Sequence, residues 1–189
     1  MKLAYINDER REGALAWLCA SVYGRHMGLT PLIEFAGLDR LLEQQSARIV
    51  ALCDETGRPL SLALLVLDVE GAGLALRLLA TPEHQRGQGH ARTLVGRLAA
   101  TTAMRVETRK PELEAFFRTF GFVRWYRTDG GARLGFNERA KIERLAEAPA
   151  LVTFDPEAVK RLFKYDPATF ENYKRRFVSG LEAFARDSA

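Results

Sequence analysis

A short apolar run followed by a glycine-bearing loop constrains the fold of this chain more than any other feature. Residues 74–80 are apolar apart from Arg77, which is typical of a strand buried on both faces. Pro82 and polar residues then turn the chain, Gly87 and Gly89 follow, and a helix is predicted at 91–100. Because another strand is predicted at 104–108, the sequence indicates one strand–helix–strand crossover.

Up to residue 136 the whole pattern predicts this order of elements: a strand, two helices, three strands, a helix, a strand, a helix and two strands. Strands are expected at residues 1–6, 49–53, 60–69, 74–80, 104–108, 123–128 and 132–136. Helices are expected at 8–23, 38–45, 91–100 and 111–120, with a less regular segment at 29–37. A meander combined with one crossover places the chain in the α+β, or mixed α/β, class.

Residues 137–189 are helical in character and are predicted to form an extension of a domain that covers residues 1–136. Asp155-Pro156 and Asp166-Pro167 are typical helix starts. The last helix carries an apolar face that must pack on this domain or on a second copy in a homodimer. Its members are Phe170, Tyr173, Phe177, Leu181 and Phe184. The basic cluster 174–176 on the same helix is expected to face solvent.

Composition describes an ordinary globular protein and excludes several classes. Hydrophobic residues make up 47% of the chain, and the net charge of +4 is spread along it, so no nucleic-acid footprint stands out. Cys19 and Cys53 show no metal-ligand spacing, and we expect no metal. The apolar stretch 60–67 is far shorter than the ~20 residues that span a bilayer. With a polar start that lacks a signal peptide, the chain is expected to be soluble and cytoplasmic, with no membrane partner.

The loop before the predicted helix at 91–100 has the properties of an anion-binding site. The first turn of a helix leaves backbone N–H groups unpaired and carries partial positive charge. Gly87, Gly89 and Ala91 would leave these groups uncovered, so that a pyrophosphate could approach them. Arg86 and Arg92 could add charge-assisted contacts. Taken alone, the loop fits a plain strand-to-helix turn equally well.

Two motifs in sequence give the loop a wider context. The run Arg86-Gly87-Gln88-Gly89-His90-Ala91 fits Q/R-x-x-G-x-G/A, and Lys110-Pro111 to Gly121-Phe122 fits N-P-x-x-x-x-x-Y-x-x-x-G-F with changes. Both patterns belong to the GNAT superfamily of N-acetyltransferases, which residues 74–122 resemble. The first 70 residues resemble it only in element order, and residues beyond 137 do not.

Three departures from the family pattern affect the assignment of residues. Pro82 stands four residues before Arg86, where the family usually has three, and Lys110 replaces the usual asparagine. Phe117 replaces the tyrosine that many members place near the sulfur of coenzyme A as a general acid. A phenyl ring has no proton to donate.

The resemblance implies a GNAT-like fold and a site for acetyl-CoA. The fold has a central mixed, mostly antiparallel sheet with splayed parallel strands and flanking helices, to which this chain adds C-terminal helices. The implied contacts with acetyl-CoA are Leu79, Ala80, Arg86, Gly87, Gln88, Gly89, His90, Ala91, Lys110 and Phe117.

The implied activity is transfer of an acetyl group from acetyl-CoA to a primary amine by direct attack, and the sequence leaves the acceptor open. Glu107 and Tyr126 are the candidates for proton transfer, in the absence of a convincing base. Glu34 lies where the family binds the acceptor, and Arg77 is either a structural ion-pair partner or a contact for the acceptor. The alternative is an inactive domain that binds acyl-CoA and regulates a partner. A nucleic-acid-binding module has little support.

Overall fold

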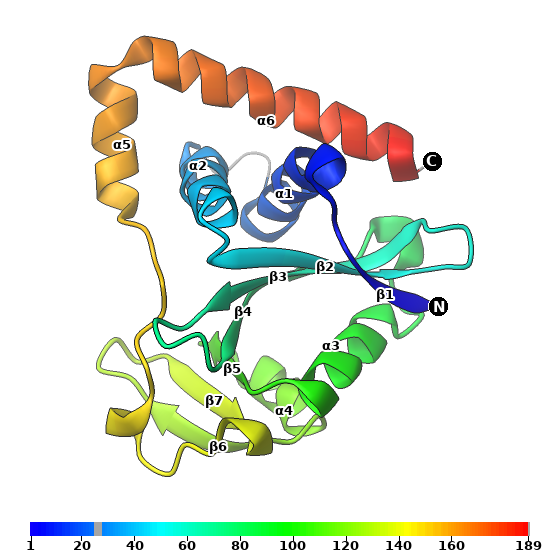
Figure 1. The fold of residues 1–189 in the computed structure, drawn as a ribbon, viewed down its shortest axis with the longest axis vertical. Helices are drawn as coiled ribbons and strands as arrows, with labels where there is room; N and C mark the ends of the chain where they lie inside the picture. Colours follow the sequence, from blue (N-terminus) through cyan, green and yellow to red (C-terminus); the bar gives the residue numbers. More distant parts are fainter. Residues whose placement is uncertain (25–27, 189) are drawn as a thin grey trace.

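The structure, a computed structural model, describes residues 1–24 and 28–188, in which one seven-stranded sheet forms the centre of the molecule (Figure 1). Its order is β1-β2-β3-β4-β5-β7-β6. Within the described residues β4 and β5 run parallel, and the other neighbouring pairs are antiparallel. The strands are β1 (Lys2–Tyr5), β2 (Ala47–Cys53), β3 (Pro59–Leu67), β4 (Leu74–Ala80), β5 (Met104–Thr108), β6 (Phe122–Arg127) and β7 (Arg133–Asn137). The predicted mixed, mostly antiparallel fold is confirmed.

Helices cover both faces of the sheet. The helices α1 (Asp8–Tyr23) and α2 (Thr30–Glu43) lie on one face, and α3 (His90–Thr101) and α4 (Pro111–Arg118) on the other. The C-terminal helices α5 (Pro156–Tyr165) and α6 (Pro167–Ser188) form an outer layer beyond α1 and α2. Short 3-10 turns span Glu83–Gln85, Glu138–Ala140 and Leu145–Glu147. Among the described helices, none combines the length and the apolar character that a membrane span requires.

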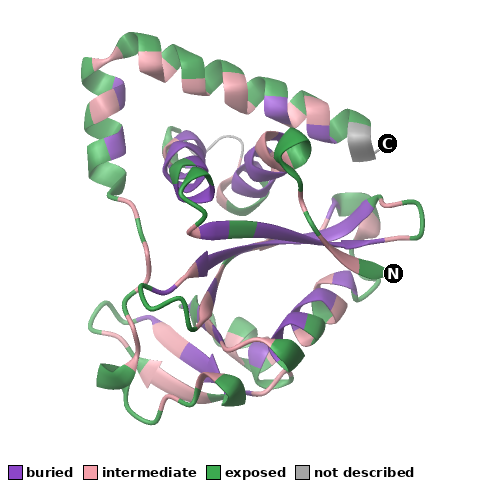
Figure 2. Cartoon of the chain, in the orientation of Figure 1, coloured by how far each residue is buried: buried purple, intermediate pink, exposed green. Residues whose placement is uncertain are grey.

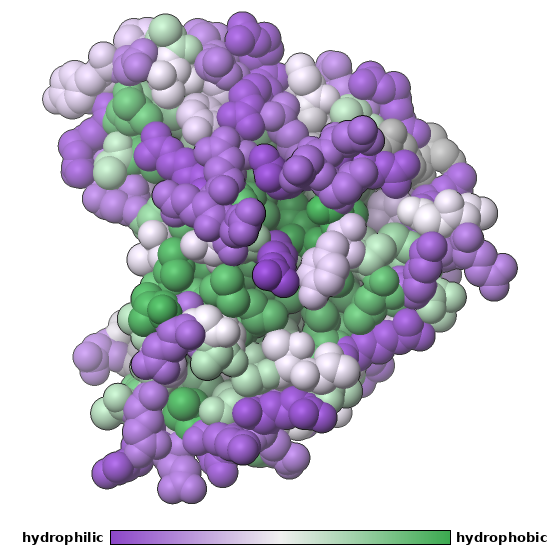
Figure 3. All heavy atoms as spheres, in the orientation of Figure 1, coloured by the Kyte–Doolittle hydropathy of each residue, from purple (hydrophilic) through white to green (hydrophobic). Residues whose placement is uncertain are grey.

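The strands at the middle of the sheet are buried because both faces are covered (Figure 2). Apolar side chains accordingly gather across the middle of the molecule, between more polar upper and lower parts (Figure 3). One apolar core lies between the sheet and the layer of α1, α2, α5 and α6, and it contains Leu15, Phe35 and Leu64. A second core lies between the sheet and the layer of α3 and α4, and it contains Leu94 and Phe122. The near-continuous apolar sequence of β3 follows from this position, since neither of its faces meets water.

The prediction of a less regular segment at 29–37 is wrong, because residues 30–37 form the first half of α2. Pro31 occupies the first turn, where its missing N–H costs no hydrogen bond. Gly37, which the prediction placed just before a short helix at 38–45, lies inside α2 against the ring of Phe154. A side chain at position 37 would overlap that ring. The glycine therefore serves a contact with the C-terminal extension and does not end the helix.

The apolar face of α6 packs on α1 and α2 of its own chain. The rings of Trp17 and Phe184 stack with their centroids 4.6 Å apart. Phe35 on α2 meets Phe177 and Tyr173 edge-on at 5.3 and 6.3 Å. Of the two alternatives that the sequence left for this face, the structure thus supports packing on the domain itself. A homodimer through these helices stays a prediction.

Arg176 corrects the prediction that the basic cluster on α6 is wholly solvated. Lys174 and Arg175 are exposed, as predicted, but the guanidinium of Arg176 points inward. Its Nε lies 2.7 Å from Oε2 of Glu12, and its Nη1 lies 2.9 Å from Oδ2 of Asp39. Because Asp39 is fully buried on α2, an unpaired carboxylate there would be costly. Helix α6 supplies the charge that compensates it.

The packing of α6 predicts a clear contrast between two of its residues. Phe184 is 8% exposed and Val178 is 48% exposed. We expect Phe184→Ala to lower the free energy of unfolding by about 3 kcal/mol or more, since it removes a buried ring. Val178→Ala should change it by less than about 0.5 kcal/mol. Urea unfolding of both variants measures the difference, and equal effects would contradict the described packing.

Candidate functional site

The two parallel strands β4 and β5 are paired over only three positions, which opens the sheet at their carboxyl ends. The pairs are Leu74 with Met104, Ala75 with Arg105 and Leu76 with Val106. Beyond them β4 keeps β3 as its neighbour and β5 keeps β7. This is the splay that the resemblance predicted between these two strands.

A β-bulge in β4 coincides with the point of separation. Leu64 of β3 pairs with Leu78 and the next residue, Leu65, pairs with Leu76, so that Arg77 is the extra residue of β4. A bulge bends its strand and redirects the side chain at that position. The bulge therefore explains both the departure of β4 from β5 and the presence of a charged residue in an apolar run.

The loop that connects β4 to α3 has the open backbone expected of an anion-binding loop. Gly87 and Gly89 adopt φ angles of +75° and +78°, which a residue with a side chain would adopt only with strain. No atom lies within 4 Å of the position that a Cβ would take at either glycine. Within the described residues, the backbone N–H groups of Gly87, Gln88 and Gly89 have no hydrogen-bond partner. These donors precede the twelve-residue helix α3, whose N-terminus adds partial positive charge.

The two arginines near the loop are placed differently. Arg86 is exposed beside the glycines, and its Nε donates to the carbonyl oxygen of Thr81 at 3.3 Å. Arg92 donates to Oγ1 of Thr119 at 3.2 Å, and its guanidinium lies 5.5 Å from the centroid of the Phe116 ring. Arg92 thus links α3 to α4. Only Arg86 is positioned on the loop itself.

His90 and Gln88 contact the same loop. His90 is the first residue of α3 and is buried, with its Nε2 3.2 Å from Oε1 of Gln85. Gln88 is exposed and donates to the carbonyl oxygen of His84 at 3.4 Å. These contacts hold the turn, so both residues support the loop and leave its backbone uncovered.

The other predicted contacts for acetyl-CoA lie at the ends of β4 and α4. Leu79 and Ala80 are partly buried at the carboxyl end of β4, next to the gap. Lys110 is exposed and caps α4, with its amide bonded to Oγ1 of Thr108 at 3.0 Å. Phe117 is buried in the core under α4, where its ring meets Phe116 at 5.2 Å. The contact of each with acetyl-CoA stays a prediction.

On the opposite face of the gap, Glu34 of α2 and Arg77 of β4 form an ion pair. Nη2 of Arg77 donates to both carboxylate oxygens of Glu34, at 3.2 and 3.0 Å. Glu34 is buried, whereas 44% of the Arg77 side chain is exposed. Burial lowers the pKa of the Arg77 guanidinium, but the nearby Tyr23, Glu34 and Glu107 more than offset this and raise it above its ordinary value. The ion pair leaves other N–H donors of Arg77 accessible.

Tyr23, at the end of α1, joins this pair and was not predicted from the sequence. Burial raises the pKa of its phenol; the charge of Arg77 opposes the shift, while the nearby Glu34 adds to it. Its neighbour Cys19 is buried too, and burial together with the Glu34 charge raises the pKa of that thiol. Neither residue was assigned a role at a site from the sequence, and only the folded contact with α2 and β4 reveals them.

The two residues that the sequence suggested for proton transfer lie apart in the fold. Glu107 is exposed on β5, and its charge reaches Arg77 across the gap. Tyr126 on β6 donates its hydroxyl proton to the carbonyl oxygen of Glu143 at 2.7 Å. That bond ties β6 to the segment leading to the C-terminal helices. A catalytic role for either residue stays a prediction, and Glu107 is the one close to the gap.

Comparison with solved structures identifies the fold. A chimera of the spermidine N-acetyltransferase SpeG from Vibrio cholerae and hSSAT has a TM-score of 0.51 and 16% identity, covering 75% of this chain and 98% of that one. A variant of SpeG from Vibrio cholerae has a TM-score of 0.52 and 15% identity, covering 78% and 100%. An acetyltransferase of the GNAT family from Staphylococcus aureus has a TM-score of 0.53 and 10% identity, covering 72% and 97%.

These likenesses establish that the chain has the fold of the GNAT acetyltransferases, as the two sequence motifs predicted. No protein-family model matches the sequence, and no curated protein matches it. At 10–16% identity the likeness to solved structures is one of fold, and the activity of this chain must be argued from its own residues.

The ion pair between Glu34 and Arg77 can be tested by a double-mutant cycle. We expect Glu34→Gln and Arg77→Met to be coupled by about 1 kcal/mol in urea unfolding, a value reduced by the partial exposure of Arg77. The pair Asp8 and Arg11, 3.0 Å apart, serves as the control, because the Asp8 side chain is 92% exposed; it should show less than about 0.5 kcal/mol. Equal coupling in both cycles would contradict the described contact.

Proposed function

We propose that the chain is an N-acetyltransferase that transfers an acetyl group from acetyl-CoA to a primary amine. The observation that carries the proposal is the open, unpaired backbone of Gly87, Gln88 and Gly89 ahead of α3. It stands at the edge of the sheet where β4 and β5 separate. A phosphate-binding backbone beside a gap between parallel strands suits a long nucleotide cosubstrate whose reactive end enters the sheet.

In this proposal the backbone, more than the side chains, holds acetyl-CoA. The amides of 87–89 and of Ala91 receive the pyrophosphate, and Arg86 adds positive charge. The partly buried end of β4 at Leu79 and Ala80 takes the pantetheine chain, and its free edge offers a donor to the thioester carbonyl. His90 supports the loop from beneath, while Lys110 and Phe117 border the site from α4.

The acceptor would enter from the face that carries Glu34, Arg77 and Tyr23. A neutral amine nitrogen attacks the thioester carbonyl carbon, the C–N bond forms, and the C–S bond then breaks to release the thiolate. Glu107 is the carboxylate placed to accept the proton of the amine, directly or through water. Phe117 cannot protonate the thiolate, so in this mechanism the thiolate leaves as such or takes a proton from solvent. Holding the amine and the thioester in the reacting geometry can alone lower the barrier by roughly 7–11 kcal/mol in favourable cases.

Calorimetric titration of acetyl-CoA tests the loop assignment. We expect micromolar binding, about −8 kcal/mol, and its loss in Gly89→Glu, which places bulk and negative charge at the pyrophosphate position. Gly57→Glu is a matched control, because Gly57 also has a positive φ and open surroundings but lies in the turn between β2 and β3.

If the wild-type protein, folded and free of coenzyme A, does not bind acetyl-CoA, the proposal is contradicted. If Gly89→Glu and Gly57→Glu lost affinity for acetyl-CoA equally, strain in the backbone, and not the pyrophosphate site, would explain the loss.

A second candidate function is a regulatory domain that binds acyl-CoA without turning it over. The observation in its favour is the burial of Phe117 in the core at the position where the family places a proton donor. The two candidates differ in turnover. Because SpeG-related neighbours are named as spermidine N-acetyltransferases, spermidine heads the panel of primary amines to test.

We expect release of free coenzyme A thiol with at least one amine, and a fall of roughly tenfold or more in kcat/KM when Glu107→Gln removes the base. Glu112→Gln, on the exposed first turn of α4, is the control and should leave the rate unchanged. Tight binding of acetyl-CoA without turnover on any amine of the panel would favour the regulatory domain.

A further inference from the structure

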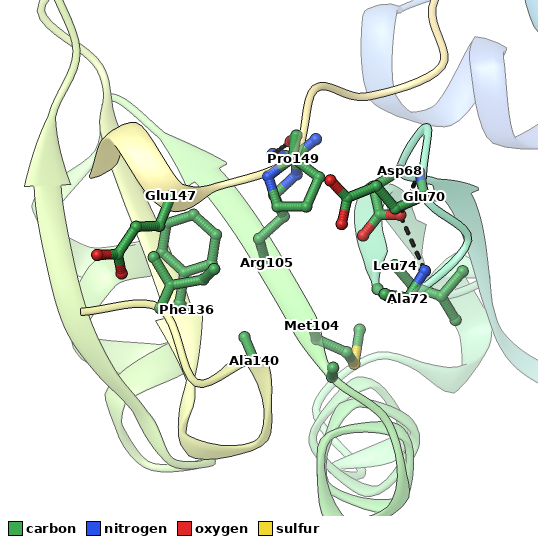
Figure 4. A pocket seen from close by; sticks show the side chains of 13 residues that line it. Asp68, Glu70, Ala72, Leu74, Met104, Arg105, Phe136, Ala140, Glu147 and Pro149 are labelled. Carbon is green, nitrogen blue, oxygen red and sulfur yellow. Dashed lines mark hydrogen bonds between the residues drawn. The ribbon is translucent and has the colours of Figure 1, made fainter. Parts of the chain in front are cut away.

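A cavity lies at the amino ends of the parallel strands, at the end opposite the glycine loop. It has a volume of about 190 Å³ and is formed where the amino ends of β4 and β5 meet the turn 68–73 and the segment 140–149 (Figure 4). Leu74 and Met104, the first residues of the two strands, are among the residues that line it. Drug-sized ligands occupy pockets of about 300–1,000 Å³, so this cavity suits a smaller metabolite.

Arg105 is the cation that faces this cavity. Its Nη1 donates to the carbonyl oxygen of Pro149 at 2.7 Å, and in the described part of the chain it forms no ion pair. Burial lowers the pKa of its guanidinium, and the charges of Asp68 and Glu107 only partly compensate. A partly buried guanidinium without a bonded carboxylate has N–H donors that suit an anionic group of a ligand.

Two carboxylates face Arg105 from the other wall. Oδ1 of Asp68 accepts hydrogen bonds from the amides of Glu70 and Ala72, at 3.1 and 2.9 Å, which fixes the turn. Its other oxygen has no hydrogen bond within the described residues. Glu70 is exposed at the rim, and Figure 4 shows the carboxyl groups of both residues on the wall opposite Phe136. The cavity therefore presents negative charge on one side and positive charge on another, without direct contact.

A third carboxylate at the rim takes no part in this arrangement. Glu147 binds Nε of Arg144 at 2.7 Å and also accepts from backbone amides of the same turn. Its carboxyl group points away from the cavity, beyond the ring of Phe136. The remaining lining is mainly apolar, and its larger members are Leu74, Met104, Phe136, Ile142 and Pro149.

We propose that this cavity binds a free α-amino acid with an apolar side chain. The carboxylate of the ligand would pair with Arg105, its ammonium group would pair with Asp68 and Glu70, and its side chain would lie against Phe136 and Ile142. A zwitterion meets both charged walls at once, whereas an amine alone leaves Arg105 unpaired and an acid alone faces two carboxylates. The site is separate from the proposed acetyl-CoA site, because it lies at the amino ends of strands whose carboxyl ends border that site.

Calorimetry with L-leucine, L-methionine and L-phenylalanine tests this inference on the full chain. We expect at least one of them to bind at millimolar concentration or below. The analogue of L-leucine without its carboxylate, isopentylamine, and the analogue without its ammonium group, isocaproate, should each bind about tenfold more weakly or not at all. No binding by any of the three amino acids would overturn the proposal. Equal binding of either analogue would overturn the assignment of a zwitterion.

Variants assign the binding to the cavity. Arg105→Gln should weaken binding of the amino acid by about tenfold or more. Asp68→Asn should also weaken binding, while it keeps the Oδ1 acceptor of the turn. Arg97→Gln is the matched control, because Arg97 also donates to one backbone carbonyl, that of Met1, at 3.1 Å. Glu70→Gln changes an exposed side chain and is not expected to affect folding. Unchanged affinity in Arg105→Gln and Glu70→Gln, with thermal unfolding like that of the wild type, would place any binding elsewhere.

Discussion

The short pairing between β4 and β5 is the constraint on which the rest of this structure depends. Hydrogen bonds join the strands at their amino ends, and the bulge at Arg77 then turns β4 away from β5. An antiparallel pair would not bring two carboxyl ends to one edge of a sheet, so the single crossover through α3 is what places the glycine loop beside the gap. The bulge has a further consequence, because it directs a charged side chain toward Glu34 on α2 and builds a polar cluster on the other side of the same gap.

The C-terminal helices belong to the same physical unit as the site. Helix α6 covers α1 and α2 with aromatic contacts, and Arg176 compensates the buried charge of Asp39 while it holds Glu12. Because α1 carries Tyr23 and α2 carries Glu34, the helix that fixes their packing also fixes the polar cluster. The extension further supplies Pro149, whose carbonyl oxygen orients Arg105, so both ends of the parallel pair use residues beyond the strands themselves.

The sequence pattern was enough to predict those elements that depend only on residues close together in the chain. The bounds of β4 and β5 agree with the prediction, and the glycine loop and α3 follow from turn residues and apolar spacing. Prediction was wrong where a distant residue decides the outcome. The helix predicted at 38–45 leaves out the residues up to Gly37, and the contact of Gly37 with Phe154 could not be foreseen. Arg176 was predicted to be solvated, because the burial of Asp39 beneath it was not known. Glu34 and Arg77 were both selected from the sequence, yet their contact, and the part played by Tyr23, arise only when α1, α2 and β4 meet.

Amide NMR spectra recorded with and without acetyl-CoA test the central claim most directly, because they report on single backbone N–H groups. If the unpaired amides of Gly87, Gln88 and Gly89 receive the pyrophosphate, their resonances should shift the most, together with those of Leu79 and Ala80 at the end of β4. The amides of the turn between β2 and β3 should remain unchanged. Shifts confined to other parts of the chain, or none at saturating acetyl-CoA, would contradict the assignment of this edge of the sheet as the acetyl-CoA site.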